Sequence, residues 1–139
     1  MSKLIVEHMG YVLLPRKTKA DKKVSINLNV YRNLHPMVEN QCKKIVKENI
    51  KKYLEETGQS NIKFKNPVNT TFQVFKPTKR KMDKSNVFSI GSKYIYDALV
   101  ELGVLQDDND DYIKEELILP TIHDKNNPRI VVTIEEIKN

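Results

Sequence analysis

Cysteine, glycine and tryptophan are scarce in this chain, which has one cysteine, four glycines and no tryptophan among its 139 residues. The single Cys42 cannot form an internal disulfide and agrees with a reducing cytoplasm, and its place on an apolar stripe indicates a core residue. The few glycines form no phosphate-binding loop, which argues against a nucleotide-hydrolysing fold. The three histidines are scattered, so a structural zinc site is not expected.

Long apolar runs are absent as well. No segment reaches the length needed to span a membrane. The apolar opening of the chain is interrupted by Glu7 and His8 and lacks the features of a signal peptide. We therefore expect a cytoplasmic protein with no membrane partner and no nucleotide cofactor.

Positive charge is in excess and unevenly distributed. The net charge is +6, but residues 1–81 carry eighteen basic and six acidic residues, whereas residues 82–139 carry six basic and twelve acidic residues. A basic half suits phosphate contacts and an acidic half suits cations, as in a nucleic-acid-binding protein that also binds metal. Lysine-rich surfaces also serve solubility alone.

The spacing of apolar residues predicts an α+β fold. Residues 24–30 alternate like a half-buried strand, and Pro36 opens a helix whose apolar stripe runs to Gly58. Further strands are expected within residues 4–14, 61–65, 70–76, 112–119 and 129–137. Together these elements predict a single domain over residues 1–139, with a mixed sheet of about four to five strands covered by two main helices.

One more amphipathic helix is expected between Arg80 and Asp110. Asp83, Ser85 and Asn86 favour a helix start, and Gly103 is a natural stop, so the helix should run from about residue 87 to 102. Apolar side chains recur at helical period, at Val87, Ile90, Tyr94, Ile95, Ala98, Leu99 and Leu102. On the opposite side, Lys93 and Asp97 should share the helix face that begins at Asn86.

Acidic residues at both ends of this helix predict a metal site. If the chain folds back, Asp83 would meet the pair Asp107 and Asp108. Magnesium prefers oxygen ligands and is commonly held by one or two carboxylates, so Asp83 with Asp108 would suffice for one ion. A second ion would use Asp107 or Asn86. In the alternative interpretation, Asp83 only caps the helix and the acidic run is a solvated loop.

These residues also resemble a known family. The helix start with Asp83 and Asn86, Lys93 four residues before Asp97, and the later pair Asp107 and Asp108 look like the RusA family of Holliday junction resolvases, which is common in phages and prophages. A weaker match is the segment from Asn29 to His35, which resembles the Asn and Tyr-Arg segment before the first helix of that family. The likeness spans most of the chain, and its specific motifs lie between residues 80 and 111.

The resemblance implies a homodimeric, Mg²⁺-dependent endonuclease, with Mn²⁺ as an alternative ion, that resolves four-way DNA junctions in a bacterial host. It implies catalytic roles for Asp83, Lys93 and Asp108. It implies metal binding by Asp83, Asp107, Asp108 and Asn86, supported by Asp97 and Ser85. The DNA contacts would come from Tyr31, Arg32, Lys79, Arg80, Lys81 and Lys84, although Tyr31 and Arg32 equally suit a buried ring and a surface ion pair.

The chain departs from the family pattern in two places. Ser85 stands where a second aspartate is expected, which lowers the negative charge available to a metal. About four extra residues, one helical turn, separate Asn86 from Lys93, and a whole turn preserves the helix face. Two other functions therefore remain: a catalytically silent DNA-binding phage accessory protein, and a metal nuclease that acts on other branched DNA.

Overall fold

The computed structural model describes residues 2–137, which form two long helices, one short helix and seven strands. Along the chain, the elements are β1 (Lys3–His8), β2 (Tyr11–Leu14), β3 (Lys22–Ser25), α1 (Leu28–Tyr31), α2 (Pro36–Glu56), β4 (Val68–Lys76), α3 (Lys84–Glu101), β5 (Ile113–Ile118), β6 (Ile122–His123) and β7 (Arg129–Glu136).

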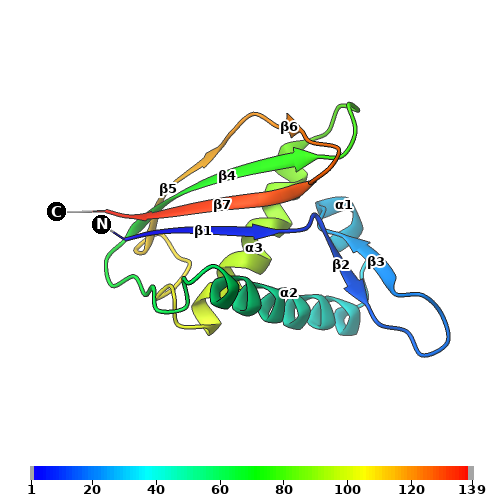
Figure 1. The fold of residues 1–139 in the computed structure, drawn as a ribbon, viewed down its shortest axis with the longest axis horizontal. Helices are drawn as coiled ribbons and strands as arrows, with labels where there is room; N and C mark the ends of the chain where they lie inside the picture. The colour runs from blue at the N-terminus through cyan, green and yellow to red at the C-terminus, as the bar shows by residue number, and fades with distance from the viewer. Residues whose placement is uncertain (1, 138–139) are drawn as a thin grey trace.

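Five strands form one mixed sheet in the order β1-β7-β4-β5, with β6 also paired to β4 (Figure 1). β7 pairs antiparallel with both β1 and β4, whereas β5 and β6 run parallel to β4. Burial alternates along β1, β4 and β7, so one face of the sheet packs on the helices and the other is only partly buried. The expected α+β domain with a mixed sheet and two main helices is confirmed.

Each long helix begins at a residue whose side chain caps it. The His35 ring accepts a hydrogen bond from the backbone N–H of Met37, and Pro36 is the first residue of α2. The Asp83 side chain accepts a hydrogen bond from the backbone N–H of Ser85 and so caps α3. This helix therefore starts at residue 84, three residues earlier than expected. α3 ends before Gly103, whose φ of 78° lies in the left-handed region that glycine favours.

Three strand predictions need correction. Residues 24–30 are not one strand, because the Asn27 side chain accepts from the backbone N–H of Asn29 and starts α1 instead. Residues 61–65 form no strand, since the N–H of Phe64 bonds to the carbonyl of Val104 in the loop after α3. Residues 4–14 break at Met9 and Gly10 into β1 and β2, which belong to different sheets.

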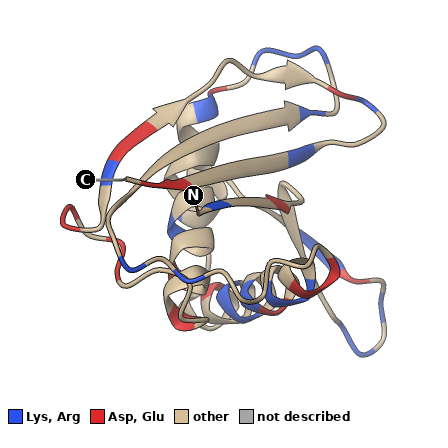
Figure 2. Cartoon of the chain, turned by 60° about the vertical axis from the view of Figure 1, so that its left-hand side comes forward, with Lys and Arg blue, Asp and Glu red and all other residues tan. Residues whose placement is uncertain are grey.

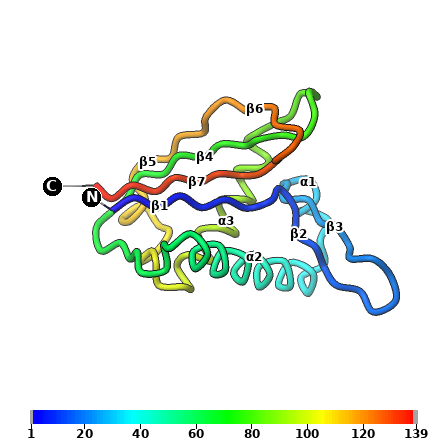
Figure 3. The backbone as a smooth tube through the Cα atoms, in the orientation of Figure 1, coloured from blue at the N-terminus to red at the C-terminus, as the bar shows by residue number. Residues whose placement is uncertain are grey.

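The β2–β3 hairpin forms the second, two-stranded sheet and extends beyond the N-terminal end of α2 (Figure 3). At the other end of the molecule, the Gln59 side chain lies along the outer edge of β1. Its Oε1 accepts from the N–H of Ile5 at 3.0 Å, and its Nε2 donates to the carbonyl of Ile5 at 2.9 Å. The short strand β6 was not expected from the sequence. None of the helices formed by residues 2–137 has the length and apolar character needed to cross a membrane.

Candidate functional site

Asp83 is exposed at the N-terminus of α3. Its Oδ1 accepts a hydrogen bond from the backbone N–H of Ser85 at 3.0 Å. No residue within 2–137 donates to its Oδ2. Asp83 therefore caps the helix with one oxygen, and its second oxygen faces no protein donor. Ser85 is exposed, and Lys84 and Asn86 are half-buried in the same first turn.

A cationic loop leads into Asp83, and we call residues 77–82 the basic loop. Lys76 donates from Nζ to the carbonyl of Arg80 at 2.8 Å, which folds the loop back on the end of β4. Lys79, Arg80 and Lys81 are exposed, and within residues 2–137 none of them forms an ion pair with a carboxylate. These three charges are therefore available to an anion in solution.

The second group of carboxylates lies beyond the other end of α3. Asp107 accepts through Oδ1 from the N–H of Asp108 at 2.7 Å and through Oδ2 from Asn109 at 3.2 Å. Partial desolvation raises the pKa of Asp108, and the neighbouring Asp107 and Asp97 raise it further. Repulsion by Asp97 is thus one cause of the raised pKa of Asp108. We call Asp97, Asp107 and Asp108 the acidic group.

The structure does not bring Asp83 to Asp107 and Asp108 within one chain. α3 has 18 residues, a length of about 27 Å at the usual helical rise. Asp97 lies fourteen residues after Asp83, about 21 Å along the axis. In Figure 2, blue residues mark the loop after β4 and red residues mark the segment that leads from α3 into β5. Within residues 2–137 of a single chain, no three His, Cys, Asp or Glu side chains are arranged to hold a metal ion.

Lys93 is held on the side of α3 that faces α1 and α2. Its Nζ donates to Tyr31 Oη at 3.1 Å and lies 5.1 Å from the centre of that ring. Tyr31 in turn donates to Glu39 at 2.9 Å, and Lys43 pairs with Glu39 at 3.4 Å. The hydrogen bond with Tyr31 raises the pKa of Lys93, and the charges of Glu39 and Asp97 raise it further. Lys93 is thus a positioned ammonium near the middle of α3, about one helical turn before Asp97.

Tyr31 and Arg32, which were both expected to contact DNA, differ in their exposure. Tyr31 is half-buried in the contact with Lys93, whereas Arg32 is exposed at the end of α1. The sequence did not reveal that Glu39 completes this network, because Lys93, Tyr31 and Glu39 lie on three different helices.

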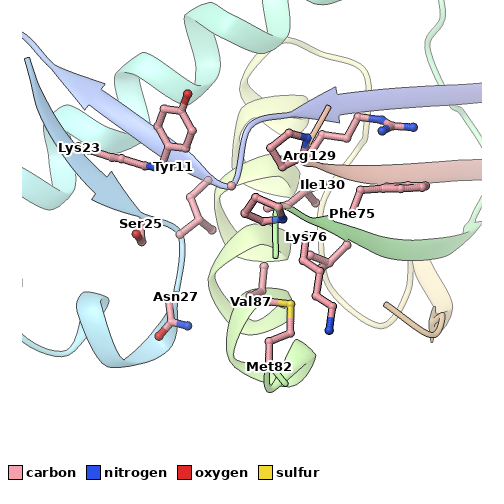
Figure 4. Close-up of a pocket in the computed structure, with 15 residues that line it drawn as sticks. Tyr11, Lys23, Ser25, Asn27, Phe75, Lys76, Met82, Val87, Arg129 and Ile130 are labelled. Atoms are coloured by element: carbon pink, nitrogen blue, oxygen red, sulfur yellow. The ribbon is translucent and has the colours of Figure 1, made fainter. Parts of the chain in front are cut away.

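A cleft of about 440 Å³ opens beside the first turn of α3 (Figure 4). Its walls come from the β2–β3 hairpin, the end of β4, the start of β7 and the residues around Asp83. The side chains that contribute most to its chemistry are Tyr11, Lys23, Lys76, Met82, Val87 and Arg129. Sequence spacing did not predict this cleft, because segments far apart along the chain form it.

No protein-family model matches this sequence, and no curated protein matches it. The likeness to the RusA family therefore depends on the motif residues themselves, chiefly Asp83, Lys93, Asp97 and the pair Asp107 and Asp108.

Proposed function

We propose that the protein is a Mg²⁺-dependent endonuclease that acts as a homodimer on four-way DNA junctions, as the resemblance to the RusA family implies. The observation that supports this best is the position of Asp83. Its exposed carboxylate comes two residues after three exposed cations that have no carboxylate partner within residues 2–137. A carboxylate suits a hard cation and the cations suit a DNA phosphate, so the two functions adjoin.

The length of α3 requires that the proposed metal site be shared. One chain keeps Asp83 about 21 Å from the level of Asp97. We therefore place Asp83 of one protomer beside the acidic group of its partner. A two-fold axis that sets the two α3 helices antiparallel would form two identical sites, as required to cut two symmetry-related strands.

The donor chemistry of these residues fits magnesium, since carboxylate oxygens are the ligands that it prefers. Asp83, Asp107 and Asp108 would hold the ion, which when bound would activate water and neutralise charge on the scissile phosphate. Lys93 lies about one helical turn before Asp97 on α3 and would stabilise negative charge that develops on that phosphate. Tyr31 would position the Lys93 ammonium through its hydrogen bond. The basic loop would hold the flanking phosphates.

A complementation experiment tests this arrangement. Asp83→Asn and Asp108→Asn should each abolish Mg²⁺-dependent cleavage of a synthetic four-way junction while leaving junction binding nearly intact. When the two inactive variants are mixed and allowed to exchange subunits, the heterodimer should regain one intact site, made of Asp83 from one chain and Asp108 from the other. The expected product is a junction nicked on one strand.

The control is a mixture of either variant with a double variant that carries both substitutions, which should remain inactive. If each site were built within one chain, the mixed single variants would show no activity either, and the shared site would be excluded. Cleavage by Asp83→Asn homodimers at the wild-type rate would remove Asp83 from the chemistry altogether.

Ser85 supports a second candidate, a DNA-binding protein without catalytic activity. It provides a hydroxyl where the family pattern has a carboxylate, and its backbone N–H is used to cap α3. Cleavage assays on junction, fork and duplex DNA with Mg²⁺ and with Mn²⁺ separate the candidates. A silent protein would bind without cutting in every case, and Ser85→Asp should then increase metal-dependent cleavage. A nuclease for other branched DNA would cut the fork in preference to the junction.

A further inference from the structure

The cleft beside Asp83 has an apolar floor and a polar rim. Its floor is formed by Ile26, Val74, Val87 and Ile130, which come from four different segments and are all buried. Tyr11, Lys23 and Asn27 line one wall, and Phe75, Lys76 and Met82 line the other (Figure 4). A volume of about 440 Å³ lies in the range of small-ligand sites.

The charges around the cleft favour an anionic ligand. Among the described residues 2–137, no aspartate or glutamate lines it, whereas Lys23, Lys76 and Arg129 do. Arg129 is already neutralised, because it pairs with Glu7 at 2.6 Å and with Asp124 at 3.1 Å. Lys76 uses one of its three N–H groups on the basic loop and keeps two. Lys23 forms no ion pair within residues 2–137.

An aromatic ring lies beside one of these cations. The Lys23 ammonium is 4.3 Å from the centre of the Tyr11 ring, and both side chains border the cleft. An apolar floor, a ring and two ammonium groups together suit a ligand with a flat, partly apolar body and a phosphate. A nucleotide has this chemistry.

The position of the cleft limits where such a nucleotide would come from. Met82 lines the cleft and is the residue immediately before Asp83. A nucleotide inside a duplex is stacked and paired, so its base would have to leave the stack to enter, and this costs least where stacking or pairing is already weakened. At a branch point the stack of each arm ends.

We propose that the cleft binds one unstacked nucleotide of the DNA substrate at the branch point. Its base would lie among the apolar side chains beside Tyr11, and its phosphate would lie at the rim beside Lys23. This inference rests on the proposed action on branched DNA, and it assigns the recognition of the branch to a site separate from the metal ligands.

The test uses a four-way junction with 2-aminopurine either at the branch point or within an arm, mixed with the full chain in EDTA so that no cleavage occurs. We expect the fluorescence at the branch to rise on binding, because the base leaves the stack, and the arm probe to stay unchanged. Removing the base at the branch should weaken binding about fivefold, the lower end of what stacking of one base on an aromatic side chain contributes.

Lys23→Glu should abolish the rise at the branch, and Lys22→Glu is its matched control. The two lysines are neighbours on β3 and exposed, so each substitution changes the net charge equally, but only Lys23 lines the cleft. Successive side chains on a strand point to opposite faces, so Lys22 faces away. Lys22→Glu should keep the fluorescence rise.

Each outcome separates this inference from the proposed function. If the junction is bound and cut but the branch probe behaves like the arm probe, or if the two variants behave alike, the cleft does not bind the nucleotide and the nuclease proposal stands. If the branch signal depends on Lys23 but no metal supports cleavage, the cleft is confirmed and the nuclease proposal fails. If the protein does not bind DNA, both fail.

Discussion

At the scale of single residues, His8 is an enclosed imidazole at the end of β1. Its Nδ1 is 2.6 Å from the carbonyl oxygen of Met9, which can only accept, so Nδ1 carries the proton. Its Nε2 lies 3.1 Å from the side-chain nitrogen of Asn49 and accepts from it. Burial lowers the pKa of His8 below its usual value. The folded protein thus holds this ring neutral.

The pH dependence of stability follows from that shift. Because the folded pKa is lowered, the unfolded chain binds the proton first, and the free energy of unfolding should fall as the pH drops below the ordinary histidine value of about 6.5. The slope contributed by this one group should approach about 1.4 kcal/mol per pH unit until the folded pKa is reached. Urea unfolding at several pH values between about 7.5 and 5.5 measures this slope. The two limits lie about one pH unit above and below the ordinary histidine pKa of about 6.5.

The control for this prediction is the exposed His123. His8→Asn should flatten the pH dependence, and His123→Asn should leave it close to wild type. Equal slopes in the two variants would mean that the His8 ring is not held neutral by the fold.

Local chemistry is the part of the site that the sequence could predict. The sequence pattern identifies Asp83 as a helix-start residue, and it caps α3 through the neighbouring Ser85. The partner of Lys93 could not be predicted in the same way, because Tyr31 lies 62 residues earlier in the chain. Contacts between side chains on separate helices depend on packing, which spacing along one helix does not encode.

At the scale of elements, the packing of α3 on the sheet depends on Gly91. A Cβ at this position would lie 3.1 and 3.3 Å from two ring atoms of Phe72 and 3.6 Å from Ile130. Phe72 has little room to move, since it is fully buried and packs edge-on against Phe88 with ring centres 5.1 Å apart. A side chain at residue 91 would press on the Phe72 ring, so the glycine lets the helix approach the sheet this closely.

Gly91→Val should therefore destabilise the protein by about 1 to 3 kcal/mol, the usual cost of overpacking a core. Ser89→Val is the control, because Ser89 is exposed on the same helix and serine and valine have similar helix propensities. Denaturant unfolding at constant pH gives both values. A Gly91→Val protein as stable as the Ser89→Val protein would show that the helix can shift away from the sheet without any cost in stability.

Helices were predicted from the sequence more accurately than strands. α2 and α3 were expected within three residues of their observed starts, because each has a capping residue and a long apolar stripe. Residues 24–30 were assigned wrongly, since the alternation of buried and exposed side chains ends at Ile26 and Asn27 diverts the backbone into α1. A local side-chain hydrogen bond thus decides the backbone where the sequence pattern alone predicts a continuing strand.

At the scale of the whole molecule, the basic loop and the acidic group lie one helix length apart. Replacing Lys79, Arg80 and Lys81 with Ala should weaken DNA binding and reduce the slope of log affinity against log salt by about one unit for each phosphate that the loop no longer binds. Fluorescence anisotropy with a labelled junction, repeated over a range of salt concentrations, measures both quantities.

A triple variant on α2 is the control for charge alone. Lys44, Lys51 and Lys52 are exposed, and their replacement with Ala removes the same net charge. We expect it to leave the salt slope nearly unchanged. If the two triple variants reduce the slope equally, the basic loop has no special place on the DNA surface.

The distance between the two acidic ends was the feature of the site that sequence reasoning did not obtain. The period of α3 predicted its faces and its ends, but the expectation that the chain folds back ignored that an intact helix of 18 residues keeps its ends about 27 Å apart. The helix α3 therefore holds apart Asp83 and the pair Asp107 and Asp108, which the sequence motif suggested would meet. This length is the reason that the proposed site needs two protomers.

The amide of Gln59 has a consequence for how two copies can meet. By bonding to both backbone groups of Ile5 that point outward, it occupies the place where an added strand would begin to pair. A strand of a neighbouring molecule therefore cannot pair with β1 at Ile5 unless the Gln59 side chain first moves away from the strand edge. Continuous sheets running through two copies are disfavoured on that border, and symmetric association is directed to helical surfaces or to the opposite border at β5 and β6.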